Sequence, residues 1–177
     1  MWYRAAHMNK PIRGQKGFTL IEILVVIGII AILAAIVIIA INPARQFAQA
    51  RNAQRTANVN AILNAVGQYI ADNKGVLPTQ VSALANDTAA AVGTSGANIC
   101  AVLIPTYMPA LTVDPLTDPD GAGVVLSQGE AISSANCGAG ADTGYTIQHS
   151  ATNRIKVCAP DAVEPAIPGS LAICVER

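Results

Sequence analysis

Hydrophobic and polar positions divide the chain into three stretches with different patterns. From Phe18 to Ile41 nearly every residue is apolar, and Glu22 is the only charged residue between Lys16 and Arg45. As a helix this stretch would be roughly 36 Å long at about 1.5 Å per residue, which is enough to cross a hydrocarbon core. The first stretch therefore predicts a membrane-spanning helix.

The second stretch is amphipathic. It begins at Asn42-Pro43, where the proline removes a backbone donor and should break or kink the helix. Beyond it, apolar residues recur at steps of three and four, which predicts a helix to about residue 73 whose apolar face packs on the C-terminal domain. These residues are Val59, Ile62, Val66, Tyr69 and Ile70, with Leu63 on the flank. Lys74-Gly75 should end the helix.

The other faces of this helix carry Arg45, Arg51 and Arg55. The simplest interpretation is a solvated or subunit-facing surface, and contact with membrane phosphates is the alternative. The whole chain has 11 basic and 11 acidic residues, but residues 1–17 hold four of the basic ones and no acid, which leaves 7 basic against 11 acidic residues. Non-specific nucleic-acid binding needs a basic excess, so nucleic acid is not an expected partner.

The third stretch, residues 76–177, contains strand-like runs separated by turns rich in Gly, Pro, Asn and Asp. The expected strands are residues 145–149, 154–159 and 171–176, with a short fourth at 124–126 and short helices at 81–85 and 99–104. Together the three stretches predict an α+β fold, in which a long N-terminal helix packs on a small C-terminal antiparallel sheet.

Four cysteines, Cys100, Cys137, Cys158 and Cys174, all follow the apolar stretch. An even number beyond a membrane-targeting segment indicates an oxidising compartment and up to two disulfides, with three pairings open. Cys158 and Cys174 lie in successive strand-like runs, which favours pairing them with each other and Cys100 with Cys137. Zinc binding is the competing interpretation, and the lack of a C-x-x-C spacing disfavours it.

Three aspartates, Asp114, Asp118 and Asp120, lie in a loop rich in proline. Carboxylate oxygens suit calcium, although the spacing is not that of an EF-hand, and ordinary turn formation is the competing interpretation. We expect no cofactor other than such a structural calcium ion.

Nothing in the sequence indicates catalysis. His149 has no adjacent nucleophile motif and should lie on the surface at a strand end, and the motifs of serine hydrolases, P-loop proteins and zinc proteases are absent from the sequence. The chain is therefore not expected to be an enzyme.

Glu22 is the costly residue of the apolar stretch. An acid at the centre of a membrane helix costs roughly 2.5–3.5 kcal/mol on insertion scales, and less near an end, so a plain signal anchor does not explain it. A secretory signal peptide has a shorter apolar run and a small-x-small cleavage site, and a soluble core helix would not be this long and uncharged. Four cations precede the stretch and three arginines follow it, which narrowly favours a cytoplasmic N-terminus.

The run Gly17-Phe18-Thr19-Leu20-Ile21-Glu22, after a basic leader and before a long apolar run, resembles the class III signal of type IV pilins and type II secretion pseudopilins. The resemblance implies the pilin fold, cleavage by a prepilin peptidase between Gly17 and Phe18, and N-methylation of Phe18. The implied parts are a leader (1–17), a membrane and assembly helix (18–41), an amphipathic helix (42–75) and a globular domain (76–177).

In this family the acid at the position of Glu22 neutralises the N-terminal amine, here that of Phe18, on a neighbouring subunit. The implied partners are further copies in a helical filament, the peptidase, an inner-membrane assembly platform, minor pilins and, before assembly, the membrane. The implied location is the cytoplasmic membrane, with the C-terminal domain periplasmic or extracellular, and then the filament. Two alternatives stay open: a minor pilin for DNA uptake or adhesion, and an unprocessed, membrane-anchored extracellular binding module that keeps residues 1–17.

Overall fold

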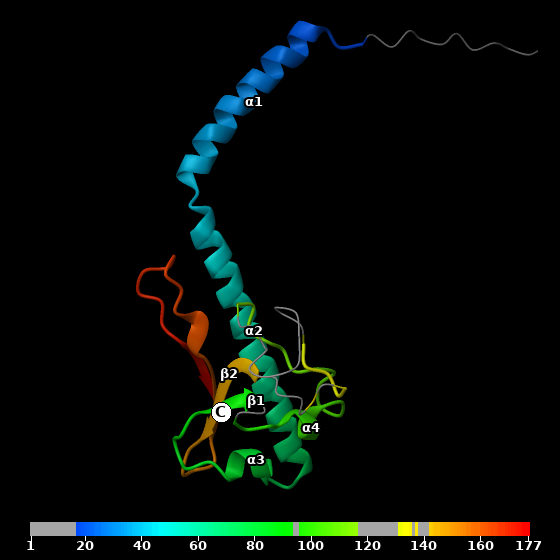
Figure 1. The fold of residues 1–177 in the computed structure, drawn as a ribbon, viewed down its shortest axis with the longest axis vertical. Helices are drawn as coiled ribbons and strands as arrows, with labels where there is room; N and C mark the ends of the chain where they lie inside the picture. Colours follow the sequence, from blue (N-terminus) through cyan, green and yellow to red (C-terminus); the bar gives the residue numbers. More distant parts are fainter. Residues whose placement is uncertain (1–16, 94–95, 117–130, 136, 138–141) are drawn as a thin grey trace, which may run out of the picture. The chain divides into compact units, whose positions relative to one another are not determined.

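The computed structural model describes residues 17–93, 96–116, 131–135, 137 and 142–177 (Figure 1). The chain divides into two compact units, residues 1–42 and 43–177, and each is described by itself. The described part of the first unit holds one helix, and the second unit holds a long helix with a four-stranded sheet. The predicted α+β fold is confirmed.

Helix α1 (Leu20–Ala40) is the apolar stretch. Its segment Leu20–Ile38 is long and apolar enough to cross a membrane by length and composition. The large apolar residues of this segment are 46–83% exposed, so the first unit buries almost none of them itself. Exposing such an apolar surface to water is unfavourable, so we expect lipid or other protein to cover it.

The predicted break in the helix is present. Ile41 adopts an extended conformation, with φ −104° and ψ 118°, and α2 (Pro43–Asp72) starts at the proline. A residue before proline is disfavoured in the α conformation, and proline is well accommodated at the first position of a helix, so Asn42-Pro43 both ends one helix and starts the next.

Helix α2 buries the face that its periodicity predicts. Val59, Ile62 and Val66 are fully buried, Leu63 is buried rather than flanking, and Tyr69 is half-buried. Beyond the helix, Lys74 and Gly75 have positive φ values of 56° and 87°, and the Gly75 amide donates to the Ile70 carbonyl oxygen at 2.8 Å. This left-handed ending is the one expected from Lys74-Gly75.

The sheet is antiparallel with the order β1-β2-β3-β4, and α2 packs on β3 and β4. The strands are β1 (Ala90–Gly93), β2 (Asp142–His149), β3 (Ile155–Ala159) and β4 (Ile173–Glu176). Along β2 and β3 buried and half-buried residues alternate, as expected for a sheet with one face on the core. Strand β1 was not predicted, and the strand expected at residues 124–126 lies outside the described residues.

Among the described residues, the second unit also contains three short helical elements: α3 (Thr79–Ser82), α4 (Cys100–Leu103) and the 3₁₀ helix η1 (Pro160–Ala162). The structure joins Cys100 to Cys137 and Cys158 to Cys174, which is the pairing favoured from the sequence. The second disulfide links directly opposed positions of β3 and β4, so it fastens the last strand to the sheet.

The expectation of a surface His149 is wrong. The residue is 6% exposed, with Nε2 2.9 Å from the Leu84 carbonyl oxygen and Nδ1 3.2 Å from the Ser150 carbonyl oxygen. It occupies the last inward-facing position of β2, following Thr143, Tyr145 and Ile147. The period-two pattern of the strand therefore decides its burial.

Candidate functional site

The N-terminal end of α1 is closed by a reciprocal pair of hydrogen bonds. Thr19 is extended, with φ −80° and ψ 151°, and its Oγ1 accepts from the Glu22 amide at 3.3 Å. The Glu22 carboxylate in turn accepts from the Thr19 amide at 3.5 Å. This arrangement is a capping box, which satisfies two backbone donors at a helix start, and an acid there also suits the helix dipole.

The sequence predicts a charge role for Glu22, and its capping role was not predicted. The signal was present, since Thr-x-x-Glu directly before an apolar run is the pattern of a capping box. The helix consequently begins at Leu20, two residues later than predicted, and Gly17 and Phe18 lie outside it.

Gly17 and Phe18, the residues on either side of the predicted cut, are both exposed. Phe18 is 79% exposed, and no heavy atom stands within 4 Å of the position that a Cβ on Gly17 would occupy. In the described part of the chain, the peptide bond between them is thus accessible and not held in a helix. Glu22 lies in the first turn of α1, four residues after Phe18.

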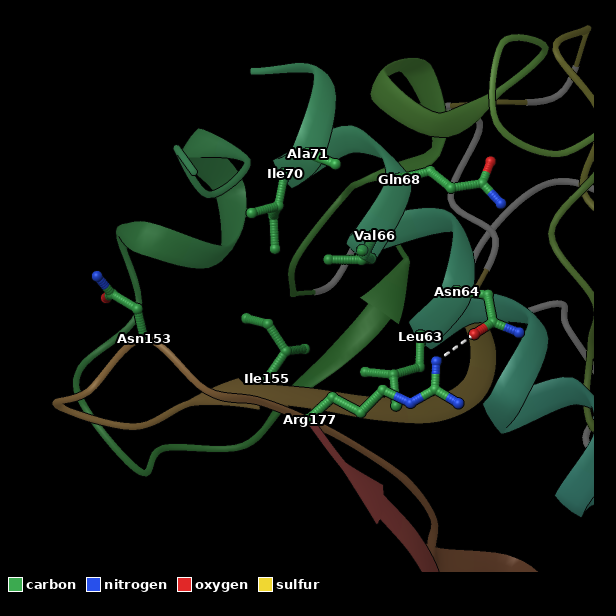
Figure 2. Close-up of a pocket in the computed structure, with 10 residues that line it drawn as sticks. Leu63, Asn64, Val66, Gln68, Ile70, Ala71, Asn153, Ile155 and Arg177 are labelled. Atoms are coloured by element: carbon green, nitrogen blue, oxygen red, sulfur yellow. Dashed lines mark hydrogen bonds between the residues drawn. The ribbon is translucent and has the colours of Figure 1, made fainter. Parts of the chain in front are cut away.

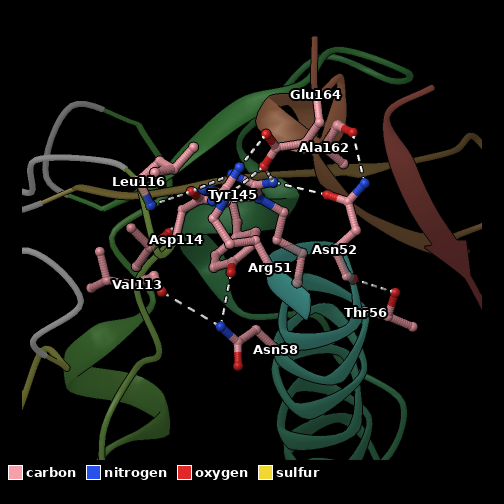
Figure 3. A network of polar contacts seen from close by, with 12 residues as sticks. Arg51, Asn52, Thr56, Asn58, Val113, Asp114, Leu116, Tyr145, Ala162 and Glu164 are labelled. Carbon is pink, nitrogen blue, oxygen red and sulfur yellow. Dashed lines mark hydrogen bonds and ion pairs between the residues drawn. The ribbon is translucent and has the colours of Figure 1, made fainter. Parts of the chain in front are cut away.

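A second polar cluster lies inside the globular unit. We call it the arginine cluster, comprising Arg51, Arg55, Asp114 and Glu164 (Figure 3). Arg55 is fully buried and binds Asp114 with two hydrogen bonds, Nε to Oδ2 at 2.5 Å and Nη2 to Oδ1 at 2.9 Å. Its Nη1 donates to Glu164 Oε1 at 2.6 Å. Arg51 also donates two hydrogen bonds to Glu164, Nε to Oε1 at 2.7 Å and Nη2 to Oε2 at 2.6 Å.

The charges of the arginine cluster balance, with two guanidinium groups against two carboxylates. Hydrogen bonding from Arg51 is the largest cause that lowers the pKa of Glu164 to about 2; burial works against it, and hydrogen bonding from Arg55 adds to it. The Asp114 hydrogen bond is the largest cause that raises the pKa of Arg55, against its burial. The lowered pKa of Glu164 and the raised pKa of Arg55 both favour the charged forms at physiological pH.

A neighbouring pair extends this polar network into the core. Asn58 Nδ2 donates to the phenolic oxygen of Tyr145 at 2.8 Å, and burial is the main cause that raises the pKa of Tyr145 to about 12. The ion pairs of the arginine cluster and the Asn58–Tyr145 hydrogen bond join α2 to segments far along the chain. We therefore assign it a structural role in fixing α2 on the sheet and its loops.

The expectation that the arginines lie on a solvated or subunit-facing surface is wrong for Arg55 and incomplete for Arg51, which is half-buried; Arg45 is exposed. Arg55 is buried because it finds two acids, 59 and 109 residues away in sequence, that offset the cost of removing its charge from water. No local pattern reports such distant partners.

Only one of the three predicted calcium ligands, Asp114, lies among the described residues. Asp114 is fully buried and its carboxylate binds the Arg55 guanidinium and the Leu116 amide. Asp118 and Asp120 lie outside the described residues. Within the residues that the structure describes, no group of three or more His, Cys, Asp or Glu side chains is placed to hold a metal ion.

A shallow groove of about 560 Å³ runs between the C-terminal half of α2 and β3 (Figure 2). Its floor includes Leu63, Val66 and Ile155, and Arg177 at its rim donates to Asn64 Oδ1 at 2.5 Å. The described residues that line it provide neither a nucleophile nor an acid. We assign it no chemistry.

Acidification tests the arginine cluster. The folded-state pKa of Glu164, about 2, lies below its ordinary value of 4.5, so its stabilising contribution is complete above about pH 4.5 and is lost as the pH falls towards 2. We expect the stability advantage of the wild type over Glu164→Gln to shrink across this window. Thermal unfolding of the full chain in detergent, followed by circular dichroism, measures it. An advantage that stays constant down to about pH 2 would contradict the assigned pairing.

Comparison with known proteins decides the nature of the N-terminal segment. The family model of the prokaryotic N-terminal methylation motif matches residues 12–38. The chain carries a type IV pilin-type prepilin signal. Searches of the curated proteins and of the solved structures found no significant match.

The prepilin signal covers both sides of the predicted cut, the capping box and most of α1. The motif supports a pilin-like or pseudopilin subunit, and the apolar helix is long enough to cross a membrane. The match ends at Ile38, so the arginine cluster and the sheet lie beyond it.

Proposed function

We propose that this chain is a structural subunit of a type IV pilus-like filament or of a type II secretion pseudopilus. A prepilin peptidase cuts between Gly17 and Phe18 and methylates the new N-terminus. The processed chain then leaves the membrane and joins a helical filament through its N-terminal helix. No catalytic activity is assigned to it.

One observation carries the proposal: Glu22 is the only charged residue of α1 and lies in its first turn, four residues after Phe18. Cleavage creates an amine on Phe18 at the end of an apolar helix. In a low-dielectric environment that cation needs a counter-charge, because paired charges interact far more strongly there than in water. Glu22 supplies it, on a neighbouring subunit, and the pairing sets the axial register of the filament.

The capping box gives Glu22 a second task before assembly. Its carboxylate accepts from the Thr19 amide in the isolated chain, so the acid is not left without a partner while the helix is in the membrane. In the filament, the amine of a neighbour adds a full positive charge to the same carboxylate. A single residue thus serves the monomer as a cap and the filament as a charge partner.

The partners that follow are copies of the chain, the peptidase, an inner-membrane assembly platform and minor pilins. The proposed location is the cytoplasmic membrane, with residues 43–177 on its outer side, and then the filament. Intact-mass measurement tests the proposal at its first step. We expect a chain that starts at Phe18 with one added methyl, and a chain that keeps residues 1–17 in a peptidase-competent cell would overturn it.

A further inference from the structure

The loop that leads into β4 exposes an apolar surface. We call residues 162–172 the apolar loop. Its only charged residue is Glu164, which is 4% exposed and turned inward to Arg51 and Arg55. Outward it presents Val163, 57% exposed, and Leu171, 79% exposed. Because the charge of Glu164 points inward, the outer face of the loop is apolar, and its exposure to water is unfavourable.

The apolar loop is held together by its own hydrogen bonds. The Ile167 amide donates to the Glu164 carbonyl oxygen at 2.9 Å, and the Ser170 amide to the Ile167 carbonyl oxygen at 3.1 Å. The Ser170 hydroxyl accepts from the Glu164 amide at 2.8 Å. Polar backbone groups satisfied in this way lower the cost of moving the loop into a less polar environment.

The apolar loop is fastened near the start of α2. Asn52 Nδ2 donates to the Ala162 carbonyl oxygen at 3.0 Å, and Arg51 reaches Glu164. Figure 1 shows this orange-red segment beside the N-terminal half of α2. At about 1.5 Å per residue, Arg51 is only about 12 Å along the helix axis from Pro43. Phe47, one turn before Arg51 on the same side of α2, is 67% exposed.

We propose that the apolar loop and Phe47 rest on the surface of the lipid bilayer that α1 spans. The inference depends on the membrane stage of the proposed function. Two residues, Ile41 and Asn42, join α1 to α2, so the start of α2 is where the chain leaves the bilayer. The headgroup region adds roughly 5–8 Å to each side of the hydrocarbon core, which matches the about 6 Å along the helix axis from Pro43 to Phe47. The apolar loop is attached one turn further along, at Arg51.

A lipid surface fits the chemistry of this patch better than a polar partner does. Exposed apolar side chains are typical of interfacial membrane contacts, where the binding strength scales with the apolar area that is buried. Among the described residues next to the loop in sequence, Asp161, which directly precedes it, is the one exposed acid. The charge of Glu164 is neutralised by Arg51.

Depth-dependent quenching tests the proposal on the full chain. The chain has one tryptophan, Trp2, so a Trp2→Phe background leaves only an introduced reporter. Val163→Trp and Leu171→Trp report on the apolar loop. Val76→Trp is the matched control, because Val76 is 62% exposed and follows the opposite end of α2. Each variant is reconstituted in vesicles of phosphatidylethanolamine and phosphatidylglycerol with brominated acyl chains.

We expect both loop reporters to be quenched severalfold more strongly than the Val76→Trp control, at every protein-to-lipid ratio. Equal quenching of loop and control reporters, in chains that float with the vesicles, overturns the loop contact and leaves the proposed function standing. The loop tryptophans could instead show blue-shifted emission without bromine quenching, and the shift could disappear when the protein is diluted with more lipid. That result would assign the patch to contact with a second copy of the chain and would also overturn the proposed lipid contact. If the chain does not float with the vesicles, the membrane stage of the proposed function is overturned, and the loop contact is overturned with it.

Discussion

Replacing Glu22 by alanine is expected to leave the chain in the membrane and reduce the filament yield by at least about tenfold, because a buried charge that loses its partner costs about 3–5 kcal/mol. In this variant the Phe18 amine of each neighbouring subunit has no counter-charge within an apolar helix bundle. The measurement is the amount of the chain in the sheared filament fraction relative to the membrane fraction. Filament yield equal to the wild type would contradict the pairing.

Two matched variants separate the charge of Glu22 from its capping role. Glu22→Gln keeps an acceptor for the Thr19 amide and removes the charge, so it should assemble as poorly as the alanine variant. Thr19→Ala removes the hydroxyl that accepts from the Glu22 amide and keeps the charge. Losing the cap costs about 0.5–2 kcal/mol of helix stability, so this variant should assemble far better than Glu22→Gln. Equal loss in both would assign the residue's role to capping alone.

Arg55→Met should be the most destabilising single change in the arginine cluster. Arg55 is fully buried between Asp114, also fully buried, and Glu164, which is 4% exposed. Methionine fills part of the space but leaves the buried Asp114 without its bidentate partner. Breaking one side of a buried ion pair costs about 3–5 kcal/mol. Urea unfolding of the full chain in detergent, followed by circular dichroism of the sheet unit, measures the loss.

Two comparisons make this prediction specific. Arg154→Met breaks an exposed pair with Glu176, whose side chains are 60% and 41% exposed, so it should cost no more than about 1 kcal/mol. Combining Arg55→Met with Asp114→Leu should recover part of the loss, because no unpaired acid is left beside residue 55. A loss for Arg55→Met as small as that for Arg154→Met would contradict the burial and pairing of the cluster.

Elements with a local signal were predictable from the sequence. The long apolar run of α1 indicates a membrane helix. The three- and four-residue spacing of Val59, Ile62 and Val66 and the alternation along β2 indicate which faces are buried. The prepilin signal is also local, because the peptidase and the membrane read a short contiguous segment. Such features need no knowledge of what the rest of the chain does.

Features that depend on distant partners could not be predicted in this way. Strand β1 has no alternating pattern in its four residues, and it is a strand because Ala90 pairs with Ile147 of β2. Arginine is usually a surface residue. Arg55 is buried because the fold brings Asp114 and Glu164 to it from distant parts of the sequence. His149 was assigned from its place at the end of a run, although the inward phase of that run already placed it inside.

The mass of the mature chain tests the central claim most directly. Gly17→Val is the matched control, since a Cβ at Gly17 meets no atom within 4 Å and should change the peptidase site without disturbing the chain itself. From cells with an active prepilin peptidase, we predict that the wild type has the mass of residues 18–177 with one methyl group, and that Gly17→Val keeps residues 1–17. A wild-type chain that retains its leader in those cells, or starts at any residue other than Phe18, would contradict the account.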